Sequence, residues 1–163
     1  MGSLRTAIVT VSTLRAKGEG EDESGDRLAE LVARLGGEIA GRELVPDDFE
    51  VIAGRLRHWA DDIGCALVLT SGGTGFAPTD VTPEATRAVI EREAPGIAEA
   101  MRFVSREHSR HWMLSRGVAG IRGSALIVNF PGSPRSIPEM GEAIADSLPH
   151  ALALLAGEHP AHD

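Results

Sequence analysis

Residues 65–86 read CALVLTSGGTGFAPTDVTPEAT. The apolar run at 65–70 is typical of a buried strand, and three glycines within four positions follow it almost at once. Because glycine lacks a Cβ, such a loop can adopt positive φ and lie close to a ligand. We expect Thr82 to be the N-cap of the next helix and Pro83 its first residue. The stretch therefore predicts a strand, a glycine-rich turn and a helix N-terminus, an arrangement that binds phosphate.

Strand-like and helix-like segments alternate along the rest of the chain. We expect strands at residues 6–12, 38–45, 65–70 and 124–130, and helices that begin near residues 24, 49, 83, 96, 134 and 151. The helix from residue 83 is expected to continue to about residue 93. Residues 15–23 are expected to form a mobile loop, and residues 105–122 show no clear pattern. The alternation predicts an α/β fold with a mostly parallel sheet covered on both faces. We expect one domain over residues 1–157 and a frayed tail over 158–163.

Composition narrows the class of protein. The chain has 163 residues, of which 42% are apolar and 25% charged, a balance typical of globular proteins. A net charge of −8 and an aromatic content of 4% argue against nucleic-acid binding. The single Cys65 cannot form an internal disulfide, which favours the reducing cytoplasm. No apolar run approaches the roughly 20 residues of a membrane span, and no basic cluster supports the formal lipidation pattern at residues 1–6.

Four predicted turns follow strands, after residues 12, 45, 70 and 130. In parallel sheets such turns meet at one edge, where ligands bind. The candidate binding residues in or near these turns are Ser24, Gly25, Ser71, Gly72, Gly73, Thr74, Gly75, Gly132 and Ser133. Ser133, followed by Pro134, also fits a simple helix N-cap, and Ser24 is similarly ambiguous.

Asp47 and Asp80 are the candidate catalytic and metal-binding residues. Each lies in a predicted turn before a helix, where aspartate often serves only as a cap. Thr82 and Asp48 are available to cap these two helices, which leaves both carboxylates free to face the site. Carboxylates repel phosphates unless a cation bridges them, and Mg²⁺ is commonly held by one or two carboxylates together with substrate phosphates. The sequence therefore predicts Mg²⁺ at Asp47 and Asp80.

The glycine-rich loop differs from two common nucleotide-binding motifs. Gly20 and Gly25 have the spacing of a P-loop, but Asp26 stands where that motif needs lysine. Pro78 replaces the third glycine of a dinucleotide-binding fingerprint. A βα turn without any ligand and a flavodoxin-like flavin site stay open as alternatives.

Histidines and arginines gather between residues 102 and 122. His108 and His111 follow Glu107, an order that differs from the His-Glu-x-x-His zinc motif. The five arginines are typical of a solvated helix face, although one or two of them could reach phosphates. They are Arg102, Arg106, Arg110, Arg116 and Arg122.

Taken together, the motifs resemble the molybdopterin-binding domain of MogA/MoaB-type molybdenum cofactor proteins and the G domain of gephyrin. The longest similarity is TSGGTG at residues 70–75 with PTDVTPEAT at 78–86. Three further stretches agree in the expected order: DESG at 22–25, LVPDD at 44–48 and NFPGSP at 129–134. The similarity runs from about residue 6 to residue 155.

This resemblance implies a three-layer α/β/α sandwich, assembled as a homotrimer or as a hexamer of two trimers. It also implies Mg²⁺-dependent transfer of AMP from ATP to the terminal phosphate of molybdopterin, with release of pyrophosphate. The family's two important aspartates correspond to Asp47 and Asp80, and its pterin and nucleotide pocket to residues 71–75, Gly132 and Ser133. Thr13 stands where relatives often have aspartate, so one carboxylate beside the expected nucleotide pocket is missing. A molybdopterin-binding or scaffold protein without turnover is therefore the alternative.

Overall fold

A computed structural model describes residues 3–161. Residues 1–2, which begin the lipidation pattern, and residues 162–163, which end the predicted tail, lie outside the described residues. Among residues 3–161, none of the helices combines the length and the apolar composition that a membrane span requires.

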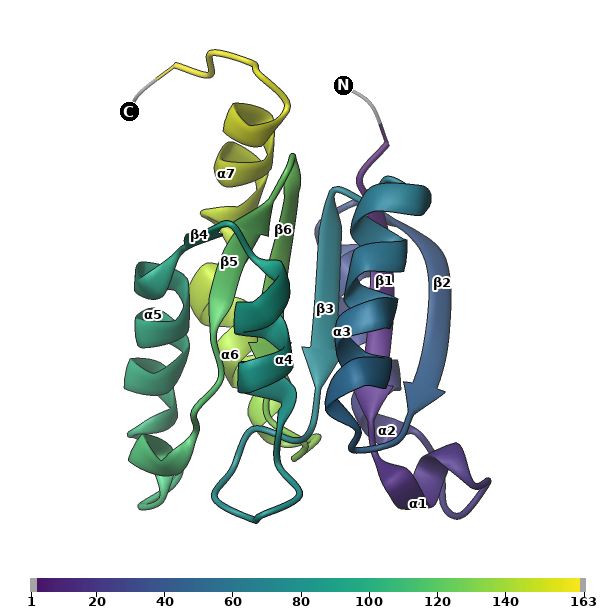
Figure 1. The fold of residues 1–163 in the computed structure, drawn as a ribbon. Coiled ribbons are helices and arrows are strands. Elements are labelled where there is room, and N and C mark those ends of the chain that lie inside the picture. Colours follow the sequence, from purple (N-terminus) through teal and green to yellow (C-terminus); the bar gives the residue numbers. More distant parts are fainter. Residues whose placement is uncertain (1–2, 162–163) are drawn as a thin grey trace.

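Six strands form one sheet in the order β2-β1-β3-β6-β5-β4 (Figure 1). The strands are β1 (Arg5–Val11), β2 (Glu38–Val45), β3 (Leu67–Ser71), β4 (Arg92–Glu93), β5 (Ala119–Arg122) and β6 (Ala125–Phe130). β2, β1, β3 and β6 run parallel to one another, whereas β5 and β4 are antiparallel to their neighbours. The prediction of a mostly parallel sheet is confirmed.

Helices cover both faces of this sheet, which confirms the three-layer α/β/α sandwich. They are α1 (Thr13–Ala16), α2 (Glu23–Arg34), α3 (Phe49–Arg57), α4 (Thr82–Val89), α5 (Pro95–Ser105), α6 (Ser136–Ala145) and α7 (Leu148–Leu155), with a π-helix at His58–Asp62 and a 3₁₀ turn at Trp112–Leu114. In Figure 1, α3 and α4 lie in front of the sheet and α2 and α6 behind it. Because β1 is buried on both faces, Ile8 packs in the core beneath α2 and α6 while Val9 packs in the core beneath α3 and α4.

Two strands and one short helix were not predicted. Residues 90–93 were expected to continue a helix, but α4 ends at Val89 because Ile90 is extended and the Glu91 N–H donates to the Ile121 carbonyl (2.8 Å). This bond starts the antiparallel pairing of β4 with β5. The expected loop at residues 15–23 also begins inside α1.

Asn129 lies near the end of β6 and links this strand to β3, to α4 and to the start of β5, just before the carboxyl edge of the sheet. Its buried amide nitrogen donates to the hydroxyls of Thr70 on β3 and Thr86 on α4, both at 3.0 Å. Its amide oxygen accepts from the Val118 N–H at 3.1 Å. All three bonds are buried, so they hold β3, α4 and the start of β5 in one arrangement beside the site.

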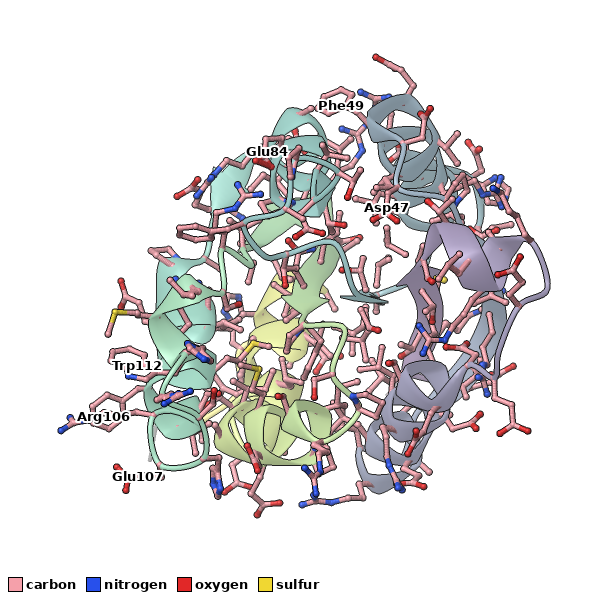
Figure 2. All side chains as sticks on the ribbon, turned by 90° about the horizontal axis from the view of Figure 1, so that it is seen from below. Asp47, Phe49, Glu84, Arg106, Glu107 and Trp112 are labelled. Carbon is pink, nitrogen blue, oxygen red and sulfur yellow. The ribbon has the colours of Figure 1, made fainter. Side chains whose placement is uncertain are left out.

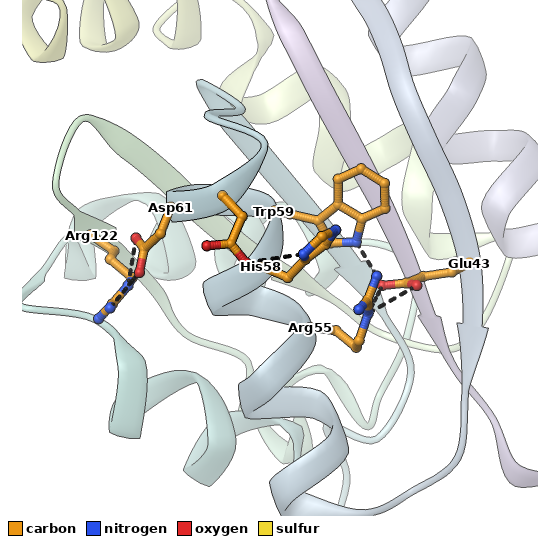
Figure 3. A network of polar contacts seen from close by, with 7 residues as sticks. Glu43, Arg55, His58, Trp59, Asp61 and Arg122 are labelled. Carbon is orange, nitrogen blue, oxygen red and sulfur yellow. Dashed lines mark hydrogen bonds and ion pairs between the residues drawn. The ribbon is translucent and has the colours of Figure 1, made fainter.

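The π-helix attaches α3 to the edge strand β2 (Figure 3). The Trp59 indole N–H donates to the Glu43 carboxylate at 2.6 Å, and the Arg55 Nε donates to the same carboxylate at 2.8 Å. Trp59 lies against Gly41, where a Cβ would stand only 2.2 Å from the indole ring. These contacts fix β2, and with it the turn that carries Asp47.

Candidate active site

The glycine-rich loop leaves the sheet beside β1, where the direction in which successive strands are added to the sheet reverses. β1 pairs with β2 on one side and with β3 on the other, and ligands of doubly wound sheets bind beyond such a point. Gly72 adopts φ +95° and donates its N–H to the Phe130 carbonyl at 3.1 Å. A Cβ at Gly72 would lie 2.3 Å from the Val11 carbonyl oxygen, so only glycine fits between the ends of β1 and β6.

The loop returns at the start of α4, where the expected cap is absent. The Thr82 N–H donates to the Gly73 carbonyl at 3.1 Å, and Thr82 is already the first helical residue after the N-cap Val81. The prediction of Thr82 as N-cap is therefore wrong: its hydroxyl is turned toward Gly73, where a Cβ would lie 2.3 Å from it. Among the described residues, the buried hydroxyls of Thr82 and Ser71 have no hydrogen-bond partner. Unpaired buried hydroxyls are uncommon in folded proteins, and here both side chains are fully buried.

A cavity of about 370 Å³ opens beside the loop. Gly73, Thr74, Gly75, Asp80 and Gly132 line it, so the structure brings two of the predicted turns together. Part of the wall comes from α6 and from the segment between α5 and β5. These lining residues include Ser105, Ser109, His111, Trp112, Ser115 and Ser136. The sequence did not identify them, because residues 105–118 lack a regular period; their closely spaced serines and histidine were the only signal.

Asp80 faces this cavity and is half-buried. One of its carboxylate oxygens accepts the Ala77 N–H at 3.0 Å, and its backbone carbonyl accepts from the Arg116 guanidinium at 2.9 Å. The second carboxylate oxygen has no hydrogen-bond partner within the described part of the chain. Asp80 therefore presents one free anionic oxygen beside the backbone of residues 73–75.

Asp47 lies on another side of the loop and does not line the cavity. In Figure 2, which looks onto this end of the sheet, Asp47 lies near the start of α3, whereas Trp112 lies beside α5. Both the N–H and the hydroxyl of Thr13 donate to one Asp47 carboxylate oxygen (3.1 and 2.9 Å), and the Asp47 N–H donates back to the Thr13 hydroxyl (3.0 Å). The other carboxylate oxygen would lie 3.3 Å from a Cβ at Gly73. Asp48 caps α3 through the Val51 N–H at 2.9 Å, as predicted.

The first and last of the predicted turns also meet. The buried Ser24 hydroxyl donates to the Gly132 carbonyl at 2.8 Å. Gly25 follows it in the first turn of α2, where its N–H donates to Asp22 at 3.0 Å. The prediction of Ser133 as N-cap is wrong, because α6 begins later, at Ser136, with Arg135 as N-cap. Ser133 itself is exposed and does not line the cavity.

Three of the five arginines are engaged inside the structure rather than on a solvated helix face. Arg102 donates to the Gly117 carbonyl at 2.7 Å, and Arg122 pairs with Asp61 at 2.7 Å. Arg116 binds the glycine-rich loop and pairs with Glu84. These three guanidiniums therefore bind carbonyl or carboxylate oxygens of other segments and are not free side chains.

A family model described as a probable molybdopterin binding domain matches residues 7–150. The structure of MoaB from Thermus thermophilus, described as a molybdopterin biosynthesis enzyme, is similar with a TM-score of 0.89 and 48% identity, covering 95% of this chain and 98% of that one. A structure of MogA is similar with a TM-score of 0.88 and 37% identity, covering 93% and 99%. The chain belongs to the MogA/MoaB-type family of molybdenum cofactor biosynthesis proteins.

Curated MogA/MoaB-type relatives match along nearly the whole chain. The molybdopterin adenylyltransferase of Escherichia coli K12 is 39% identical over 174 residues, covering 98% of this chain and 89% of its own length. The molybdopterin adenylyltransferase of Helicobacter pylori J99 is 37% identical over 161 residues, covering 98% and 92%. The molybdenum cofactor synthesis protein cinnamon of Drosophila melanogaster is 37% identical over 160 residues, but this chain spans only 26% of its length.

The side chains of this MogA/MoaB-type site can bind Mg²⁺ only together with ligands from outside the protein. Within residues 3–161, no group of three or more His, Cys, Asp or Glu side chains could hold a metal ion. Asp80 and Asp47 each keep one carboxylate oxygen without a protein donor. Mg²⁺ characteristically takes one or two carboxylates and completes its octahedron with phosphate oxygens and water, so the donor set fits a metal that arrives with a phosphorylated substrate.

Proposed function

We propose that this chain is a molybdopterin adenylyltransferase, which transfers AMP from ATP to the terminal phosphate of molybdopterin and releases pyrophosphate. The observation that carries the proposal is the cavity, in which Asp80 faces the same space as the backbone of Gly73, Thr74 and Gly75. The adenylyltransferase names of the E. coli and H. pylori relatives, matched over almost their whole length, support this reaction.

The reaction places two phosphorylated molecules side by side at one edge of the sheet. A terminal phosphate oxygen of molybdopterin attacks the α-phosphorus of ATP; a new phosphorus–oxygen bond forms while the bond to the β-phosphate oxygen breaks, and pyrophosphate leaves. The attacking phosphate is already ionised, so no general base is needed. The protein contributes mainly position and electrostatic stabilisation.

The residues of the loop supply these two effects. Backbone N–H groups of Gly73, Thr74 and Gly75, with Gly132 and Ser133 from the opposite turn, would hold phosphates in line. Ser71 and Gly72 would shape the start of this loop, because the Gly72 N–H is already bonded to the Phe130 carbonyl. Ser24 and Gly25 would set the position of the Gly132 turn. Asp80 and Asp47 would hold Mg²⁺, which when bound offsets negative charge on the phosphates. Asp47 is held ready for this by Thr13, which stands where relatives often have a carboxylate.

We further propose that the enzyme works in the cytoplasm as a homotrimer or as a hexamer of two trimers. Among the described residues, Leu14, Phe76, Phe103 and Met113 are more than 60% exposed, and a subunit contact that covered some of them would favour association. Sedimentation velocity at micromolar concentration tests this, and a monomeric mass would contradict it.

The activity is tested by incubating the purified chain with molybdopterin, ATP and Mg²⁺ and measuring adenylylated pterin and pyrophosphate. Asp80→Asn should abolish turnover while leaving the fold intact, because an amide oxygen can still accept the Ala77 N–H. Asp47→Asn should also lower the rate. Asp48→Asn is the matched control, since asparagine caps helices as well as aspartate does.

Two results would change the assignment. AMP transfer by Asp80→Asn at the wild-type rate would remove the role given to this carboxylate. Tight binding of molybdopterin by the wild-type chain without any adenylylated product would favour a binding or scaffold protein, the alternative that Thr13 suggests by replacing a carboxylate.

A further inference from the structure

Arg116 contacts the glycine-rich loop at several points, although it lies 41 positions after Gly75 in the sequence. Its backbone N–H donates to the Thr74 carbonyl at 2.8 Å. Its Nε donates to the Gly75 carbonyl at 2.7 Å and its Nη2 to the Asp80 carbonyl at 2.9 Å. Its Nη1 pairs with the carboxylate of Glu84 in the first turn of α4. One side chain therefore joins both ends of the segment between Gly75 and Asp80.

That segment has few other contacts. Residues 76–79 are all exposed. Within the described part of the chain, the hydrogen bonds made by these four residues are the two that connect Ala77 with Asp80: the Ala77 N–H to the carboxylate at 3.0 Å, and the Asp80 N–H to the Ala77 carbonyl at 2.9 Å. Both bonds lie inside the loop and move with it. The position of Asp80 relative to the sheet therefore depends on Arg116.

We infer that Arg116 is a positioning residue that fixes the carboxylate of Asp80 in the cavity. The inference rests on the proposed adenylyl transfer, because only there does the place of this carboxylate determine a rate. Arginine suits the task because its planar guanidinium presents several N–H groups in fixed directions, here toward two carbonyls and one carboxylate. Lysine offers a single flexible ammonium and cannot reproduce this fork.

Arg116 is itself held from the helical layer. Arg102 on α5 donates to the Gly117 carbonyl at 2.7 Å and thus fixes the backbone next to Arg116. Arg102 is half-buried, so its guanidinium is confined between α5 and this segment. The positions of α5, Arg102, Arg116 and Asp80 are therefore connected by consecutive contacts.

The ion pair with Glu84 has an electrostatic consequence. The hydrogen bond from Arg116 lowers the pKa of the Glu84 carboxyl below its ordinary value, so Glu84 stays ionised as the counter-ion of Arg116 at neutral pH. All three guanidinium nitrogens already donate to protein acceptors, so we assign Arg116 an action on the reaction through Asp80 rather than the role of a phosphate ligand.

Arg122 offers a matched control. It too makes an arginine–carboxylate pair, with Asp61 (Figure 3), and a bond to a backbone carbonyl, that of Val89 at 2.8 Å. Its side chain is 25% exposed, against 32% for Arg116. In the sheet, Arg122 on β5 lies opposite Ala125, the first residue of β6. The site lies beyond the last residue of β6, at the other end of that strand. Its removal therefore costs similar contacts at the opposite end of the sheet.

The test combines hydrogen exchange with steady-state kinetics on Arg116→Ala, Arg116→Lys and Arg122→Ala. In Arg116→Ala we expect the hydrogen-bonded amides of Ala77 and Asp80 to exchange at least about tenfold faster than in the wild type, because the loop opens locally. We expect kcat to fall about 100-fold, the typical cost of a misplaced catalytic group. The Mg²⁺ concentration for half-maximal rate should rise, and excess Mg²⁺ should restore part of the rate. Arg116→Lys should resemble Arg116→Ala, and Arg122→Ala should leave all three quantities near the wild-type values.

Each outcome decides between positioning and another role. Unchanged exchange in the loop of Arg116→Ala and Arg116→Lys would overturn the inference. A raised KM for ATP or molybdopterin with unchanged kcat would also overturn it, because Arg116 would then be a substrate ligand. If the wild-type chain transfers no AMP, the proposed function fails, whereas faster loop exchange in Arg116→Ala alone would still support the contact of Arg116 with the loop.

Discussion

Replacing Gly73 by alanine places a methyl group in occupied space. Gly73 adopts φ +68°, and a Cβ there would lie 2.3 Å from the Thr82 hydroxyl oxygen and 3.3 Å from a carboxylate oxygen of Asp47. Thr82 is fully buried, so its hydroxyl has little room to rotate away. We expect Gly73→Ala to destabilise the protein and to displace the Asp47 carboxylate, which the proposed reaction uses.

The cost has two parts that can be measured separately. The left-handed backbone costs a residue with a Cβ about 1–2 kcal/mol, and an overpacked methyl group costs about 1–3 kcal/mol more, so the free energy of unfolding should fall by about 2–5 kcal/mol. Gly36→Ala isolates the first part, because Gly36 has nearly the same φ of +69° and no atom within 4 Å of a built Cβ. Gly36→Ala should therefore cost only about 1–2 kcal/mol.

The assay is urea unfolding followed by circular dichroism, with Thr82→Ala added in both backgrounds. Removing the hydroxyl takes away the closest contact, so Thr82→Ala should recover about 1 kcal/mol or more in the Gly73→Ala protein that it does not recover in the Gly36→Ala protein. Equal losses for Gly73→Ala and Gly36→Ala, or no coupling between Gly73 and Thr82, would refute the reasoning from contact geometry.

Three further predictions concern single side chains. Thr13→Val removes the hydroxyl that bonds the carboxylate and the N–H of Asp47, so we expect slower AMP transfer and a loss of about 1 kcal/mol in unfolding free energy. Thr13→Ser keeps this hydroxyl and should therefore keep the wild-type rate and stability. Asn129→Leu leaves the Thr70 hydroxyl and the Val118 N–H unpaired and removes one of the two bonds of the Thr86 hydroxyl, so it should cost about 3 kcal/mol in urea unfolding; a loss below about 1 kcal/mol would contradict the network. Since Arg116 lowers the pKa of Glu84, the stability this pair contributes is present above the ordinary value of 4.5 and disappears as the pH falls through the lower folded-state value. The difference in unfolding free energy between the wild type and Glu84→Gln, at most about 1 kcal/mol for so exposed a pair, should be present near neutral pH and vanish in acid. A difference that stays unchanged down to about pH 2 would contradict this prediction.

Local patterns determined most of the architecture. Apolar runs marked the four parallel strands to within two residues, and the strand expected at 38–45 matches β2 in full. The three loop glycines at 72, 73 and 75 were expected to be free to adopt positive φ, and two of them, Gly72 and Gly73, do so. The rule that parallel strands end at one edge was enough to expect the turns to converge, and the bond from Ser24 to the Gly132 carbonyl shows that two of them do.

Local patterns were thus enough to predict a strand, a glycine-rich loop and a helix at the edge of a parallel sheet, with a phosphate site expected there. The way the loop is held follows instead from packing between distant segments: Thr82 turns its hydroxyl inward instead of capping α4, Thr13 binds Asp47 across 34 positions, and Arg116 binds Asp80 across 36. Such bonds depend on which distant segments the packed layers bring within about 3 Å, and no local period or spacing encodes that. For the same reason the irregular residues 105–118 showed no function in the sequence, although they form a wall of the cavity.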